Sequence, residues 1–72
     1  MIMPIFLAPV DEIVTITHIH SDVKVAKHLR ELGLIEGAKV RILSNEVKSV
    51  IVEVRGTRLA LDRELANAIL VS

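Results

Sequence analysis

The sequence predicts a small, mainly β barrel with one α-helix after the first long strand and a short helical turn near the C-terminus. The hydrophobic residues, 51% of the chain, are mostly Ile, Val and Leu, which favour strands. Several short β-branched segments are separated by tight turns, and only one segment has helical spacing. In a chain of 72 residues, this pattern favours a closed barrel, because closure removes exposed sheet edges.

The first half of the chain predicts an edge segment, a strand and a helix. The apolar start is interrupted by two prolines, and we expect Ile5, Phe6 or Leu7 to dock on the core. Residues 13–20 form a β-branched strand in which alternation places Val14, Ile16, His18 and His20 on one face. Ser21 or Asp22 then caps a helix from Val23 to Leu32, whose apolar stripe contains Val25, Leu29 and Leu32.

Two glycines separate this helix from the next strand. Gly33 lies where a helix needs a left-handed residue, and Leu34 can fold back on the last turn. Gly37 supplies the next position with positive φ.

The second half predicts a strand at 39–44, a loop at 45–48, and strands at 49–55 and 58–61 joined by a turn at Gly56-Thr57. A helical turn capped by Asp62 and a last strand at 69–71 complete one domain over residues 1–72.

Composition excludes several classes of function. Nine basic and nine acidic residues give a net charge of zero, whereas proteins that wrap nucleic acid normally carry a basic excess. Phe6 is the only aromatic residue, which disfavours both proline-rich peptide recognition and base stacking. Lys39, Arg41, Arg55 and Arg58 could form a basic stripe, or a solvated face offset by Glu53 and Glu46. We expect no nucleic-acid partner.

Catalysis and metal binding have little support in the residues. The chain lacks cysteine, and the sequence has no phosphate-binding glycine loop and no nucleophile–base motif, so we expect no enzyme and no required cofactor. His18 and His20 lie two apart on a strand and could share a transition metal, with Asp22 or His28 as a further ligand. The alternative is that His18 is a partly buried or barrel-rim histidine and that His20 is a polar residue at the strand end.

The resemblance of the chain to a known family rests on four stretches in order. They are the strand 13–19, the Leu-Gly-Leu helix end with its second glycine at 29–37, the segment 52–61 ending in Arg-Leu-Ala-Leu, and the closure 64–71. Together they resemble FeoA-type domains, the accessory domains of ferrous iron uptake. The family often has a proline before the second glycine, where this chain has Glu36.

The resemblance implies an SH3-like barrel and a non-enzymatic, cytoplasmic adaptor that contacts the cytosolic region of an FeoB-type membrane transporter. It also allows a metal-sensing regulatory module, like the C-terminal domain of DtxR-type iron-dependent repressors. The resemblance favours the C-terminal end of the predicted helix as the docking site for this partner. We therefore expect the partner to contact Leu29, Arg30, Gly33 and Leu34.

No direct membrane insertion is expected, because the apolar start is too short to span a bilayer. Its hydrophobicity and the barrel edges suggest a homo-oligomer in which residues 2–7 pair with a neighbour.

Overall fold

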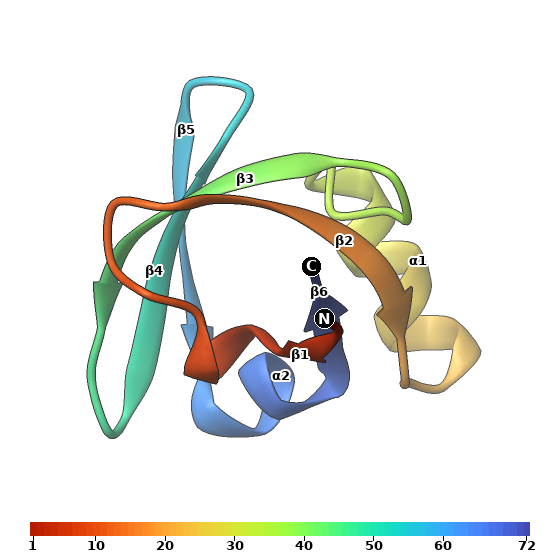
Figure 1. Cartoon of the computed structure of the whole chain (residues 1–72). Coiled ribbons are helices and arrows are strands. Elements are labelled where there is room, and N and C mark those ends of the chain that lie inside the picture. Colours follow the sequence, from red (N-terminus) through yellow and green to blue (C-terminus); the bar gives the residue numbers. More distant parts are fainter.

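The computed structural model describes residues 1–72 as a mainly antiparallel six-stranded sheet that curls into an SH3-like barrel (Figure 1). The strands are ordered β1-β6-β2-β3-β4-β5 across the sheet. The elements in chain order are β1 (Met3–Pro4), the 3-10 turn η1 (Ile5–Leu7), β2 (Ile13–Ile19), α1 (Val23–Glu31), β3 (Lys39–Asn45), β4 (Ser49–Val54), β5 (Thr57–Asp62), α2 (Arg63–Ala68) and β6 (Ile69–Val71).

Helix α1 begins and ends where the local sequence predicts. The Asp22 carboxylate accepts a hydrogen bond from the Val25 amide at 2.8 Å, which caps the N-terminus. At the other end Gly33 has φ +91°, and its amide donates to the Arg30 carbonyl at 3.0 Å. This left-handed residue reverses the chain and sends Leu34 back into the core.

A bulge in β2 corrects the predicted alternation of side chains. Ile16 pairs with Val71 and His18 with Leu70, so two steps on β2 oppose one step on β6, and Thr17 is the extra residue. Because of this extra residue, Ile19 packs on the core after Ile16, whereas His18 and His20 are exposed. The prediction that the histidines share the face of Ile16 is therefore wrong, although they do share a face with each other.

The β4–β5 hairpin turns one residue earlier than predicted. Its two turn residues are Arg55 and Gly56, with φ of 53° and 79°, and Val54 pairs with Thr57 across the turn. Two positive φ values are typical of a type I′ turn, whose twist matches that of the flanking strands. The pairing then continues from Thr57 to Asp62 without a bulge.

The barrel is completed by helix α2 and not by strand pairing, because β1 and β5, at opposite ends of the sheet order, do not pair with each other. Helix α2 follows β5 and contacts η1 and β1, which places it between the two edges (Figure 1). The Asn45 side chain fixes the N-terminal segment, since its Nδ2 donates to the carbonyls of Phe6 at 2.6 Å and Ala8 at 3.0 Å. Asn45 is thus the end of β3, not part of the predicted loop.

One hydrophobic core fills the barrel. Every fully buried side chain is apolar, and no buried side-chain polar atom lacks a hydrogen-bond partner. Ile5 belongs to this core and Phe6 packs partly against it, as expected, whereas Leu7 is exposed. Leu32 is also an exception to the predicted apolar stripe, because this C-cap residue is 37% exposed.

Candidate partner-binding surface

The four residues predicted to bind a partner lie together at the C-terminal end of α1, but only Arg30 reaches solvent. Leu29 and Leu34 are almost completely buried, and Gly33 is buried beside them. The amide of Leu34 donates to the carbonyl of Leu29 at 2.9 Å, so the two leucines shape this end of the helix from inside. A partner would therefore contact Arg30 and its exposed neighbours, and not the two leucines.

The exposed neighbours form what we call the corner surface, which consists of Arg30, Leu32, Ile35 and Glu36. Leu32 and Ile35 are 37% and 39% exposed, so each keeps part of its apolar side chain in solvent. Arg30 and Glu36 are exposed and place opposite charges beside them. The corner surface thus combines apolar area with a positive and a negative group.

Ile35 and Glu36 line two grooves. Arg30, Ala26 and Leu34 also line the first groove, and Lys39, Val54 and Arg55 also line the second. The Arg55 side chain also lies close to Gly33, where an added Cβ would be 3.6 Å from Arg55 Cδ. The tip of the β4–β5 hairpin therefore adjoins the corner surface.

Sequence reasoning missed Ile35 and Glu36. Both lie between two glycines that adopt positive φ, Gly33 and Gly37. The same turn buries Leu34 completely and leaves Ile35 39% exposed, a difference that the sequence alone does not reveal. An apolar residue that stays exposed in such a turn is a candidate for contact with another molecule.

The two predicted metal ligands lie close together. The rings of His18 and His20 stand edge to face with their centroids 4.3 Å apart, and the His18 side chain is 51% exposed. His18 Nδ1 lies 3.2 Å from Glu36 Oε2, which forms the one ion pair of the protein when the imidazole is protonated. No group of three or more His, Asp, Glu or Cys side chains is arranged to hold a metal ion, so neither Asp22 nor His28 completes a set.

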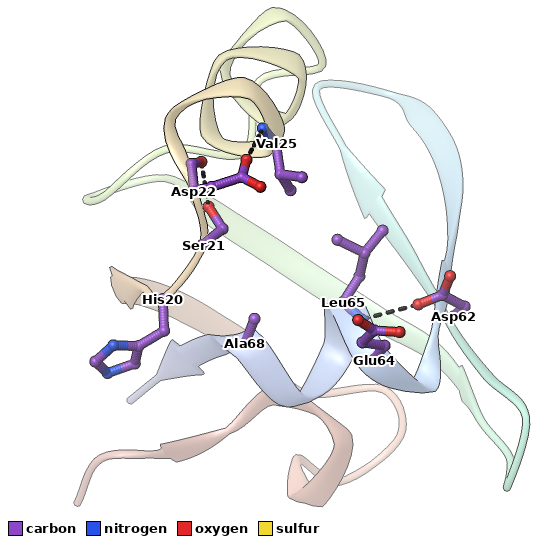
Figure 2. Close-up of a pocket in the computed structure, with 8 residues that line it drawn as sticks. All are labelled: His20, Ser21, Asp22, Val25, Asp62, Glu64, Leu65 and Ala68. Atoms are coloured by element: carbon purple, nitrogen blue, oxygen red, sulfur yellow. Dashed lines mark hydrogen bonds between the residues drawn. The ribbon is translucent and has the colours of Figure 1, made fainter.

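A separate cleft of about 390 Å³ lies between the N-terminal ends of α1 and α2 (Figure 2). Val25 and Leu65 extend toward each other from the two helices. Asp22 and Asp62 lie at its rim, but each carboxylate accepts the amide of its own helix, from Val25 and Leu65, at 2.8 Å. These carboxylates therefore have a structural role as helix caps.

The predicted basic stripe is only partly formed. Arg41 of β3, Glu53 of β4 and Arg58 of β5 are directly opposite one another on adjacent strands. Glu53 thus lies between the two arginines on the outer face of the sheet, which reduces the local positive potential. This arrangement agrees with the interpretation of a solvated face.

Comparison with solved structures shows the same fold in two groups of proteins. The model superposes with a TM-score of 0.90 on the crystal structure of an iron uptake regulatory protein, FeoA, at 24% identity, covering 99% of this chain and 96% of that one. FeoA of Stenotrophomonas maltophilia, crystallised with zinc, is 27% identical with a TM-score of 0.79, covering 97% of this chain and 89% of that one.

The second group consists of longer proteins. A manganese-dependent transcriptional repressor is 16% identical with a TM-score of 0.86, and the match covers 97% of this chain but 40% of that one. IdeR of T. acidophilum is 26% identical with a TM-score of 0.88, and the match covers 99% of this chain but 33% of that one. The chain therefore corresponds to about one third of IdeR.

Three further findings concern the whole chain. None of its helices has both the length and the apolar character needed to cross a membrane. No curated protein sequence matches it. The model of the FeoA domain family matches residues 3–72, nearly the whole chain, and the protein therefore belongs to the FeoA family.

Proposed function

We propose that this protein is a non-enzymatic adaptor of ferrous iron uptake that binds the cytosolic region of an FeoB-type transporter through its corner surface. The family match over residues 3–72 is the observation that supports a role in iron transport. A relative with 27% identity, the S. maltophilia protein, is described as an SH3-domain protein and as a candidate activating factor of ferrous iron transport. Such a role places the protein in the cytoplasm.

The composition of the corner surface supports a protein as the partner. Protein interfaces commonly have an apolar centre with a polar rim, and arginine is enriched among the residues that dominate binding. Ile35 and Leu32 provide apolar area, and Arg30 and Glu36 provide charges of both signs. A partner that fits needs an apolar side chain for the grooves beside Ile35 and a carboxylate within reach of Arg30.

The corner surface is also well ordered by the chain itself. The backbone on one side is held by the hydrogen bonds of Gly33 and Leu34 to the last turn of α1. On the other side the Gly37 amide donates to the Ile16 carbonyl at 2.7 Å. A surface fixed at both ends loses little conformational entropy on binding, which favours affinity.

Calorimetric titration of the cognate transporter's purified cytosolic domain tests the proposal. Ile35→Asp and Arg30→Glu change the corner surface without touching the core, and we expect each to weaken binding about tenfold or more. Val47→Asp is the matched control, because Val47 is 78% exposed in the β3–β4 hairpin, on the side of the barrel away from α1 (Figure 1). No binding by the wild-type protein, or equal weakening by Val47→Asp, would contradict the proposal.

A second candidate function is a metal-sensing regulatory module. It is supported by the edge-to-face pair of His18 and His20 and by the similarity to IdeR. The two histidines would supply imidazole nitrogens, which suit zinc and ferrous iron, and water would complete the coordination.

Titration with zinc and with ferrous iron separates the two candidates. The regulatory module requires saturable binding that His18→Ala abolishes and that His28→Ala, at an exposed site on α1, leaves intact. If neither metal binds and the transporter domain does, the adaptor is the function that remains.

A further inference from the structure

Strand β5 has a free edge. It lies at one end of the sheet order and pairs only with β4. Natural sheets commonly protect edge strands by shortness, proline, bulges or charged side chains, and of these β5 has only the charges of Arg58 and Asp62. The opposite edge, β1, has two of these features, because it is two residues long and ends in Pro4. In contrast, β5 is six residues long, has no proline and keeps an unbroken register with β4.

The turn of the β4–β5 hairpin determines which backbone groups face outward. Val54 and Thr57 flank a two-residue turn, so they form a hydrogen-bonded pair. In an antiparallel ladder the hydrogen-bonded pairs alternate, so Leu59 and Leu61 also direct their amide and carbonyl groups toward β4. Arg58, Ala60 and Asp62 are therefore the residues of β5 whose backbone groups point away from the sheet.

These outward groups are free at Arg58 and Ala60. No hydrogen bond outside the regular strands and helices involves the backbone of either residue, and both residues are exposed. In Figure 1, the tip of the β4–β5 hairpin extends beyond the rest of the barrel.

We propose that a second copy of this chain pairs antiparallel with β5, with Ala60 on the two-fold axis. The segment Arg58-Leu59-Ala60-Leu61-Asp62 has a positive end, a negative end and a small residue at its centre. Pairing about Ala60 places Arg58 opposite Asp62 of the partner subunit, and it does so twice by symmetry. The same register brings together the residues whose backbone groups point outward.

The charges of β5 fit this occupant. Arg58 and Asp62 form no ion pair within their own chain, and Asp62 uses only Oδ1 to cap α2, which leaves Oδ2 for an arginine. On the inner face Leu59 is half-buried, and this register places it opposite the position of Leu61, a side chain that is already buried in its own barrel. Opposite charges that face each other across strands stabilise pairing, whereas like charges oppose it.

Sedimentation equilibrium of the full chain, at concentrations up to about 1 mM, tests for the dimer. The result does not depend on whether the proposed function is correct. Ala60→Pro removes the central outward amide, and proline is tolerated on an edge that faces solvent. Arg58→Glu places like charges opposite each other. We expect each change, which acts twice in the dimer, to raise the dissociation constant roughly tenfold or more. Lys39→Glu is the control, because it makes the same charge change on β3, away from the edge.

Cross-linking provides a second readout that does not depend on the folding of the proline variant. The chain has no cysteine, so Ala60→Cys introduces a single thiol. On the axis, the two Cα atoms would be about 5.5 Å apart, which is within the range for a disulfide. We expect Ala60→Cys to oxidise to a covalent dimer faster than Val47→Cys, although Val47 is the more accessible site in a loop.

Three results would overturn the proposal. They are a wild-type chain that stays monomeric at the highest concentration, a dimer that withstands both Ala60→Pro and Arg58→Glu, and equal oxidation of the two cysteine variants. The second result would direct attention to the apolar N-terminal residues 2–7 as the contact between copies.

Discussion

The Leu34 amide hydrogen-bonds to the Leu29 carbonyl at 2.9 Å, and the side chains of both leucines are buried in the core. This single relationship ends α1, anchors the helix to the barrel and determines where the chain emerges at Ile35. It depends on Gly33, whose φ of +91° allows the chain to reverse between the two leucines. The corner surface is thus a product of the helix cap beneath it.

Gly33→Ala should lower the free energy of unfolding by about 1–2 kcal/mol, because a side chain is strained at this φ. An added Cβ would lie 3.6 Å from Val54 and Arg55, which is ordinary contact, so the cost is conformational and not steric. Urea denaturation measures it. Gly37→Ala is the matched control, with φ +90° and nothing within 4 Å, and it should cost a similar amount. A loss several times larger at Gly33 would show that contacts contribute as well.

Leu29→Glu should unfold the chain, whereas Leu32→Glu should leave it folded. Leu29 is 1% exposed, and an unpaired charge there costs several kcal/mol, which is comparable to the stability of so small a domain. Leu32 reaches solvent, so the carboxylate that Leu32→Glu introduces there stays hydrated. Circular dichroism on heating distinguishes the two variants. A cooperative transition for Leu29→Glu near the wild-type temperature would contradict the buried position of this residue.

Local signals predicted most elements of the fold correctly. The caps at Asp22 and Gly33 depend on residue type and spacing within one turn, which the sequence contains directly. The extra residue at Thr17 could not be predicted, because a bulge is defined by the register with β6, more than fifty residues away in the chain. The prediction of the side of β2 on which the histidines lie was therefore wrong.

The candidate site was predicted only in its location. Apolar residues at a helix end can serve the core or a partner, and spacing alone does not distinguish the two roles for Leu29 and Leu34. Burial assigns both to the core and leaves Arg30 exposed. Ile35 could be recognised only once the positions of the strands beside it were known, because its exposure depends on how β3 leaves the turn at Gly37.

Asn45→Ala should destabilise the protein by about 1–3 kcal/mol, because it leaves two partly buried carbonyls, those of Phe6 and Ala8, without a donor. Its effect should be concentrated in the N-terminal segment, where hydrogen exchange of the Ile5 and Ala8 amides should accelerate more than that of β4. Ser44→Ala is the control, since the Ser44 hydroxyl makes no hydrogen bond in the structure. Uniform acceleration over the whole chain would mean that the segment unfolds only with the barrel.

Asp62→Ala should cost about 1 kcal/mol of stability, because it removes the acceptor for the Leu65 amide at the start of α2. Asp22→Ala removes the equivalent cap of α1 and should cost a similar amount, so the two variants control for each other. Their structural consequences differ, since α2 connects the free edge strand β5 to β6 and completes the barrel, whereas α1 packs on its outside (Figure 1). Local exchange of the β6 amides should therefore rise in Asp62→Ala and stay at the wild-type rate in Asp22→Ala. Equal exchange in the two variants would show that the barrel does not depend on α2 for its closure.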